Sequence, residues 1–135
     1  MEREIKFEYV WKNGNSFIKE AWNLDEIAQG MCYETFTDAP LHRNYKNVAK
    51  RQFTGLKDKN GVDIYEGDIV KTTIKLLIKE SEDICVVEYD LCNPCFVMIG
   101  VNDKHITHYD FVVCGLRKVE IIGNIHQNPE LQCAQ

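Results

Sequence analysis

The opening stretch of the chain alternates apolar and polar residues with a period of two. One parity holds the large apolar side chains Ile5, Phe7, Tyr9 and Trp11. This alternation is typical of a strand with one buried face. Asn13-Gly14 follows and supplies the backbone angles of a tight turn. The pattern predicts an N-terminal β-hairpin that returns from Ser16, with the aromatic stripe packed as core rather than lining a binding groove.

A short helix is predicted after the hairpin, over residues 23–30. Asn23 has a side chain that can cap the first backbone amides, and Glu26 stands three residues later, as in a capping box. Gly30 can adopt the left-handed conformation that ends a helix. The segment therefore has room for about two helical turns.

The remaining segments favour strands. Residues 31–53 show the weakest pattern, with extended pieces expected at 31–36 and 48–53. Further strands are predicted at 69–78, 84–90, 95–101, 108–114 and 118–125, with residues 79–83 as a charged hairpin tip. Short strands at close spacing indicate an antiparallel sheet curled into a small barrel or roll. The predicted fold class is mainly β with one short helix.

Length and composition indicate one compact globular protein. The chain has 135 residues, of which 44% are hydrophobic and 27% are charged, and these values exclude disordered and collagen-like chains. This length suits one domain with a small addition. We predict a hairpin-and-helix region over residues 1–52 and a barrel domain over residues 53–135.

The charge is unevenly distributed along the chain. Sixteen basic and twenty-one acidic residues give a net charge of −5. The excess of acid lies beyond residue 53, where eight basic and thirteen acidic residues fall. One short stretch is basic and consists of Arg43, Lys46, Lys50 and Arg51. It is interpreted first as a solvated strand or loop, and alternatively as a contact for nucleic acid, which the net acidity disfavours.

Six cysteines do not indicate a disulfide framework here. The first residues are charged and alternating, without the apolar stretch of a signal peptide. The apolar runs are far shorter than the roughly 20 residues that span a bilayer. We therefore expect a cytoplasmic protein with reduced thiols and no membrane contact.

One block of sequence carries a family resemblance. Residues 54–70 read TGLKDKNGVDIYEGDIV, residues 3–7 read REIKF, and residues 120–131 read EIIGNIHQNPEL. Together they resemble the YopX family, small proteins of bacteriophages and prophages. The resemblance implies an SH3-like barrel, no established enzymatic activity, and no catalytic residues to transfer. Glu8 and Trp11 depart from the usual family opening.

The block also has a physical interpretation of its own. Gly61 and Gly67 stand where turns need backbone angles that are accessible mainly to glycine. Four carboxylates lie among these turns, namely Asp58, Asp63, Glu66 and Asp68. Their spacing matches no acid–base pair or cation loop, and turns are rich in Asp. We expect these carboxylates to stabilise turns.

The pair Cys92 and Cys95 is the sharpest chemical feature. With His105 and His108 the two cysteines could supply four ligands to one zinc ion. The favoured interpretation is instead a hairpin turn through Asn93-Pro94, with both cysteines packed as small apolar residues. A thiol-redox role is a further alternative, although redox pairs normally begin a helix and Cys95 begins a strand.

These observations favour a protein that is not an enzyme. The function expected is that of a phage or prophage accessory protein of the host cytosol, acting through protein contacts or self-association. No catalytic residue, cofactor or small-molecule substrate is identifiable. A nucleic-acid-binding module using residues 43–51 is the first alternative, and a redox or zinc protein using Cys92 and Cys95 is the second.

Overall fold

The computed structural model describes residues 4–30, 44–76, 78–92, 95–101, 108–109, 111 and 118–133. It contains two antiparallel sheets and one short helix, so the mainly β class is confirmed. The chain divides into two compact units, Met1–Gly55 and Leu56–Gln135, hereafter the N-terminal and C-terminal units. The sequence placed the division three residues earlier. No helix in the described ranges is long and apolar enough to cross a membrane.

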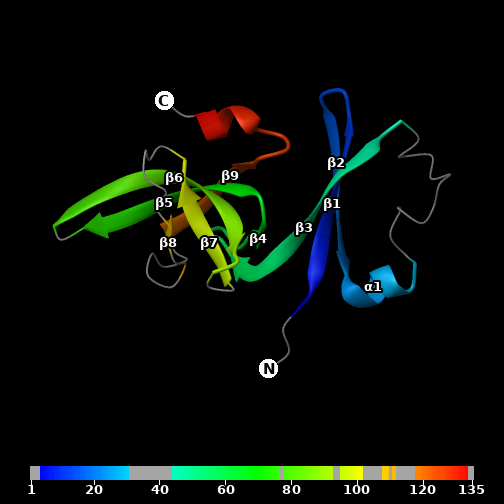
Figure 1. Ribbon diagram of the computed structural model, residues 1–135, viewed down its shortest axis with the longest axis horizontal. Coiled ribbons are helices and arrows are strands. Elements are labelled where there is room, and N and C mark those ends of the chain that lie inside the picture. The colour runs from blue at the N-terminus through cyan, green and yellow to red at the C-terminus, as the bar shows by residue number, and fades with distance from the viewer. Residues whose placement is uncertain are drawn as a thin grey trace. The chain divides into compact units, whose positions relative to one another are not determined.

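The N-terminal unit is built on a three-stranded arrangement (Figure 1). Strands β1 (Lys6–Asn13) and β2 (Ser16–Asn23) form the predicted hairpin, with Asn13 opposite Ser16. Strand β3 (Lys46–Lys57) pairs with the other side of β1. The sheet order is β2-β1-β3-β4, and β3 continues across the unit boundary, where Gly55 has a φ of 88°.

Helix α1 (Leu24–Ala28) follows β2 directly. The Asn23 side chain accepts a hydrogen bond from the Glu26 amide at 2.8 Å, and the Glu26 carboxylate accepts one from the Asn23 amide at 2.9 Å. The predicted capping box is therefore confirmed. Gly30 has a φ of 73°, the left-handed conformation expected after the helix.

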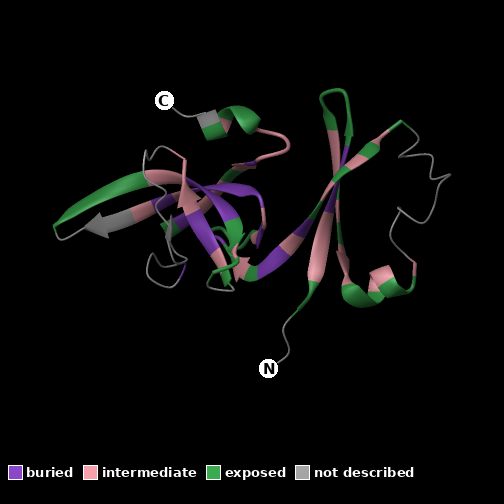
Figure 2. Ribbon diagram, in the orientation of Figure 1, coloured by how far each residue is buried: buried purple, intermediate pink, exposed green. Residues whose placement is uncertain are grey.

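One face of this sheet is aromatic. Tyr9 and Trp11 are buried there, and the partly buried apolar side chains packed against them are Phe7, Ile18, Trp22, Ile27 and Tyr45. Ile27 comes from α1, so the helix contributes to the cover of this face. The aromatic stripe packs as core, as predicted, and Figure 2 shows the burial along β1.

The C-terminal unit holds a five-stranded sheet in the order β8-β7-β6-β5-β9. Its strands are β5 (Asp68–Leu76), β6 (Lys79–Asp90), β7 (Cys95–Gly100), β8 (His108–Tyr109) and β9 (Val119–Asn124). The short strand β4 (Asp63–Tyr65) precedes them, and a 3₁₀ helix, η4 (Pro129–Cys133), follows. The strands that the structure describes form open sheets.

The buried core of this unit comes from many strands. Its buried members are Ile64, Val70, Cys85, Val87, Met98, Phe111 and Val119. The turns that lead into this core use glycine as predicted, since Gly61 and Gly67 have φ values of 79° and 84°. The expected strand at 31–36, and most of the one at 108–114, lie outside the described residues.

The predicted charged hairpin tip at residues 79–83 is wrong. These residues form the start of β6, and Leu76 lies opposite Lys79 at the end of the β5–β6 pairing. The Glu82 carboxylate of β6 lies 3.4 Å from the Lys71 ammonium of β5, so charges of opposite sign pair across the two strands. The charges therefore belong to paired strands, because the cross-strand partners accommodate them, and the turn is shorter than expected.

Candidate functional site: a lysine face on the N-terminal sheet

The basic stretch singled out in the sequence lies largely on β3, and the strand divides it between two faces. Successive residues of a strand point to opposite sides. Lys50 is exposed, with its ammonium 5.5 Å from the centroid of the Tyr9 ring on the aromatic face. Arg51 points the other way and is only 4% exposed. Arg43 lies outside the described residues, and of the others Lys50 and Arg51 lie on opposite faces of β3.

Arg51 forms an ion pair with another residue of the same sheet. Its guanidinium donates a hydrogen bond to the Glu8 carboxylate on the neighbouring strand β1, where Glu8 lies directly opposite. Both side chains are shielded from solvent. A buried ion pair is costly to break. We therefore correct the predicted binding set by removing Arg51, which stabilises the sheet instead.

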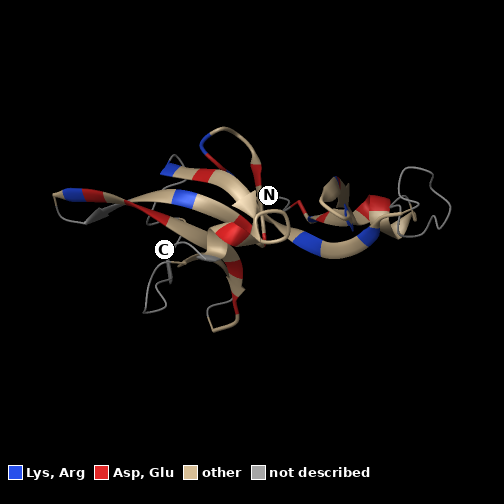
Figure 3. Cartoon of the chain, turned by 90° about the horizontal axis from the view of Figure 1, so that it is seen from above, with Lys and Arg blue, Asp and Glu red and all other residues tan. Residues whose placement is uncertain are grey.

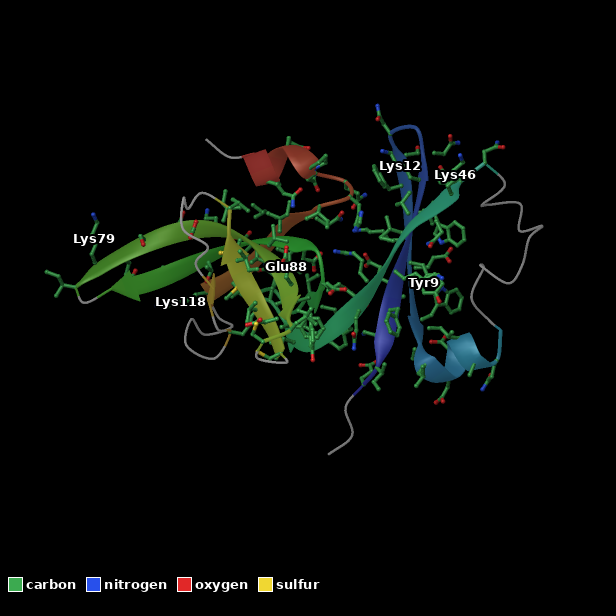
Figure 4. The ribbon with its side chains drawn as sticks, in the orientation of Figure 1. Tyr9, Lys12, Lys46, Lys79, Glu88 and Lys118 are labelled. Atoms are coloured by element: carbon green, nitrogen blue, oxygen red, sulfur yellow. The ribbon has the colours of Figure 1, made fainter. Side chains whose placement is uncertain are left out.

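Lys46 lies directly opposite Lys12 of β1. Both lysines are exposed, and Figure 4 shows them at the same end of the sheet, where the β1–β2 hairpin turns. Side chains that lie opposite each other project from the same face, with Cβ atoms about 5 Å apart. Two positive charges are thus held side by side.

A β-bulge creates this pairing. The register of β1 and β3 shifts between Val10, which faces Ala49, and Trp11, which faces Asn47. The Asn47 side-chain amide donates to the carbonyl oxygens of Val10 and Ala49, both at 3.2 Å. Without the extra residue, Lys12 would face Asn47. The bulge therefore brings Lys46 opposite Lys12, because a β-bulge changes which side chains lie opposite each other.

A third lysine joins the pair from strand β2. Lys19 lies opposite Val10, and Phe17 lies opposite Lys12. Because Val10 and Lys12 are two residues apart, all of these side chains share one face. The Lys12 ammonium stands 5.6 Å from the centroid of the Phe17 ring. We call the surface formed by Lys12, Lys19, Lys46 and Phe17 the lysine face.

Within the described part of the chain, the positive charge of the lysine face is not paired with carboxylates. Lys12, Lys19 and Lys46 are all exposed, and none of them has an ion-pair partner among the residues that the structure describes. Like charges placed opposite each other across two strands destabilise a sheet. This arrangement lowers the stability of the free protein, and an anion placed over the three ammonium groups would relieve it.

The lysines of the C-terminal unit are arranged differently (Figure 3). Four of them form ion pairs with carboxylates of the same unit, namely Lys57 with Asp63, Lys59 with Glu120, Lys71 with Glu82, and Lys118 with Glu80. The N···O distances run from 2.8 to 3.7 Å. Among the residues that the structure describes, these four lysines have their charge neutralised within the unit.

The carboxylates of the family block stabilise turns. Asp58 is 6% exposed, and its side chain accepts hydrogen bonds from the amides of Asn60, Val62 and Ile121 at 2.9 to 3.1 Å. Asp68 accepts one from the Tyr65 amide at 2.8 Å. These bonds account for both buried carboxylates without acid–base chemistry.

The cysteine pair lies at the β6–β7 turn. Cys92 and Cys95 are exposed thiols, so the prediction that both pack as small apolar residues is wrong. The Cys92 amide donates to the Asp90 carboxylate at 3.0 Å. His105 lies outside the described residues. The backbone of His108 lies opposite Ile99, four residues along β7 from Cys95, about 13 Å at the usual strand rise. This register does not favour one zinc ion shared by Cys95 and His108. Among the described residues, no three such ligands converge.

Sequence reasoning missed Lys12 and Lys19. The signal was present, because a two-residue turn fixes the hairpin register and alternation fixes the faces, and the structure places this turn at Gly14-Asn15, between Asn13 and Ser16. These two rules place Lys12, Phe17 and Lys19 together. The contribution of Lys46 could not be found in this way, since it depends on the bulge.

Comparison with known proteins identifies the family of the chain. No curated protein matches it. Among solved structures, the crystal structure of protein EF1440 from Enterococcus faecalis is similar, with a TM-score of 0.43 and 24% identity over 92% of this chain and 74% of that one. The family model described as YopX protein matches residues 3–132, nearly the whole chain. The protein belongs to the YopX family.

Proposed function

We propose that this protein is a non-enzymatic accessory protein of a phage or prophage that acts by binding an acidic partner protein through its lysine face. The observation that carries the proposal is the row formed by Lys12 and Lys46, which holds two exposed ammonium groups opposite each other with Lys19 diagonal to them. We further propose an SH3-like closure of the C-terminal unit and a cytoplasmic location in the host.

The absence of enzymatic activity is part of this proposal. The buried carboxylates Asp58 and Asp68 are engaged by backbone amides. The thiols of Cys92 and Cys95 are exposed, and Cys95 begins strand β7 rather than a helix. These features support a binding role rather than a catalytic one.

An acidic protein surface is the favoured partner. Three lysines make a small electrostatic footprint, whereas proteins that bind nucleic acid non-specifically neutralise many phosphates. The chain also carries a net charge of −5, which repels a long polyanion. A folded partner needs to present only a few carboxylates over the lysine face, together with apolar atoms for the Phe17 ring.

Nucleic acid is the second candidate, favoured by one observation. The Phe17 ring beside Lys12 could stack against an unpaired base while the lysines contact phosphates. Single-stranded DNA would then bind more tightly than an acidic polypeptide of similar charge.

Two short labelled probes of similar charge separate the candidates: a short poly-L-glutamate, and a short single-stranded DNA oligonucleotide. We expect poly-L-glutamate to bind at low salt, to be released as salt is raised, and to bind roughly threefold to tenfold more weakly to Lys46→Ala. Lys50→Ala is the matched control, because Lys50 is exposed on the same strand but on the other face. Equal losses in both variants, or no binding of either probe, would overturn the proposal.

A further inference from the structure

We infer that the acidic partner of the lysine face binds by adding an extended segment as a new strand beside β2, with carboxylates at alternate positions of that segment. This inference rests on the proposed function and names the form that the partner takes when it binds. It starts from the place of β2 at the end of the sheet order β2-β1-β3-β4, where no described strand pairs with its outer side.

The hydrogen bonding of β2 shows which of its residues face away from β1. Directly after β2, the Leu24 amide donates to the Ile5 carbonyl oxygen at 3.0 Å, on the β1 side. In an antiparallel pair, alternate residues direct their backbone groups to the same neighbour. The even-numbered residues of β2 therefore bond to β1. The odd-numbered residues Phe17, Lys19 and Ala21 direct their N–H and C=O groups to the outer edge.

This outer edge is open in the part of the chain that the structure describes. The edge-facing backbone groups of Phe17, Lys19 and Ala21 have no hydrogen-bond partner there. Lys19 and Ala21 are exposed, and Phe17 is half-buried. A row of unpaired backbone donors and acceptors is a template on which another chain can pair as a strand.

The charges of the lysine face lie within reach of such an added strand. Neighbouring strands run about 4.8 Å apart, and residues directly opposite each other share a face. A carboxylate opposite Lys19 would therefore meet its ammonium group. The Lys12 ammonium lies 5.6 Å from the centroid of the Phe17 ring, so this side chain reaches over β2. A second carboxylate, opposite Phe17, would lie beside the Lys12 ammonium.

The position of Ala21 limits the charge that the partner needs. Ala21 lies opposite Glu8, whose carboxylate forms the ion pair with Arg51. An added strand meets no net charge at this position. The partner segment therefore needs two acidic residues that are two positions apart, one opposite Phe17 and one opposite Lys19.

An acidic segment is favoured over a second copy of β2. An antiparallel pair of β2 strands centred on Lys19 would place the Lys19 side chains of the two copies opposite each other. Like charges in that arrangement destabilise a sheet, and a lysine on an edge strand is a common device against self-pairing. The same lysine attracts a strand that carries carboxylates.

Peptides with blocked backbone amides test strand addition. The probe is a labelled peptide of 8 residues, the length of β2, that alternates glutamate and threonine. In the antiparallel arrangement the residue opposite Lys19 directs its own N–H group to β2, so the glutamate amides bond and the threonine amides face solvent. We expect N-methylation of the glutamates to weaken binding by at least roughly tenfold, and N-methylation of the threonines to have little effect.

Fluorescence anisotropy at about 50 mM salt, where screening is weak, measures these affinities. Equal affinity of the two methylated peptides would overturn strand addition. Weaker binding after methylation of the threonines alone would overturn the antiparallel arrangement. Both methylated peptides carry the same charge, so a purely electrostatic contact cannot distinguish them.

Ala21→Pro tests the same edge from the side of the protein. Proline is tolerated on an edge strand where its nitrogen faces outward, and here it removes one edge donor while all three lysines remain. We expect roughly fivefold weaker binding of the unmethylated peptide, and no change in the control Ala21→Ser, which keeps the amide. Wild-type affinity in a folded Ala21→Pro would contradict the inference. If circular dichroism shows that Ala21→Pro is unfolded, the methylated peptides decide.

The lysines should contribute in the order of their distance from the edge. Lys19 lies on β2 itself, Lys12 lies on β1, and Lys46 lies on β3. Lys19→Ala should therefore weaken binding of the peptide most, and Lys46→Ala least. A larger effect of Lys46→Ala than of Lys19→Ala would place the peptide across the lysine face instead of along its edge.

The two proposals fail separately. If poly-L-glutamate binds in a manner that depends on Lys46 but the two methylated peptides bind equally, the lysine face has an acidic partner that adds no strand. If a peptide that alternates glutamine and threonine binds as tightly as the acidic one, with the same dependence on methylation, β2 accepts strands without regard to charge. The proposed function then fails while strand addition holds.

Discussion

The two units of this protein differ in how their exposed lysines are paired with carboxylates. In the C-terminal unit, lysines on neighbouring segments meet carboxylates, as in the pairs Lys57 with Asp63 and Lys59 with Glu120. In the N-terminal unit, the ion pair between Arg51 and Glu8 is buried, while Lys12 and Lys46 face each other in solvent. Exposed ion pairs contribute a little stability, whereas like charges placed opposite each other cost stability. This difference is the reason for proposing that the N-terminal unit binds an anion.

The buried pair gives the largest expected effect. Arg51→Leu leaves Glu8 shielded from water without its counter-charge, so we expect a loss of roughly 3 to 5 kcal/mol in the free energy of unfolding. Urea unfolding followed by tryptophan fluorescence measures this in the N-terminal unit, because both tryptophans of the chain, Trp11 and Trp22, lie there.

Two controls sharpen this result. The double variant Arg51→Leu with Glu8→Leu should recover most of the loss, since no buried charge remains. Lys57→Met removes an exposed partner and should change stability by less than about 1 kcal/mol. If Lys57→Met costs as much as Arg51→Leu, the contrast between the units is wrong.

Asp58→Ala should destabilise the C-terminal unit by roughly 3 kcal/mol, because three backbone amides lose their acceptor. Asp58→Asn retains one acceptor oxygen and should cost less. Amide hydrogen exchange at Val70 and Val87, both in the core of this unit, reports the change. If the amides of Asp58→Ala were as protected from exchange as those of the wild type, this carboxylate would not be needed for the fold. It would then be a candidate for a functional role.

Asn47→Ala tests whether the bulge positions the lysine face. The variant removes two hydrogen bonds that hold the bulge, and we expect a loss of about 1 kcal/mol together with weaker binding of poly-L-glutamate. The three lysines themselves are unchanged. Asn47→Asp keeps the size of the side chain but cannot donate to the two carbonyl oxygens, so it should behave like Asn47→Ala. If a folded variant bound poly-L-glutamate with unchanged affinity, the bulge would not be needed for binding.

The smallest expected effect has the opposite sign. Lys46→Glu replaces a like-charge pair with an opposite-charge pair facing Lys12, so the N-terminal unit should gain about 0.5 kcal/mol. Binding of poly-L-glutamate should fall at the same time. Lys46→Gln, which only removes one charge, should lie between the wild type and Lys46→Glu in both measurements. A variant that loses stability and binding together would indicate simple damage to the sheet.

Much of the fold follows from local sequence signals. Alternation up to Trp11 with the turn at Asn13-Gly14 predicts the β1–β2 hairpin, and Asn23 with Glu26 predicts the start of α1. These features depend on neighbours a few residues apart, and the structure confirms them. Gly61 and Gly67 were likewise predictable, because their positive φ angles suit few other residues.

The candidate site could be predicted from the sequence less completely than the fold, for a physical reason. The partner of Arg51 is Glu8, 43 residues away, and nothing near Arg51 in the sequence indicates that it is buried. The bulge at Asn47 decides that Lys46 faces Lys12, and it exists only once β1 and β3 are paired. The error at residues 79–83 has the same origin, since Glu80 and Glu82 become strand residues through their partners on β5.

Lysine acetylation measured by mass spectrometry, with and without poly-L-glutamate, tests the central claim most directly, because it compares the two units within one molecule. We predict that the probe protects Lys12, Lys19 and Lys46, while Lys50, Lys57 and Lys59 react as before. Protection that is absent from the three lysines of the lysine face, or equally strong at Lys57 and Lys59, would contradict the assignment of this face as the contact surface.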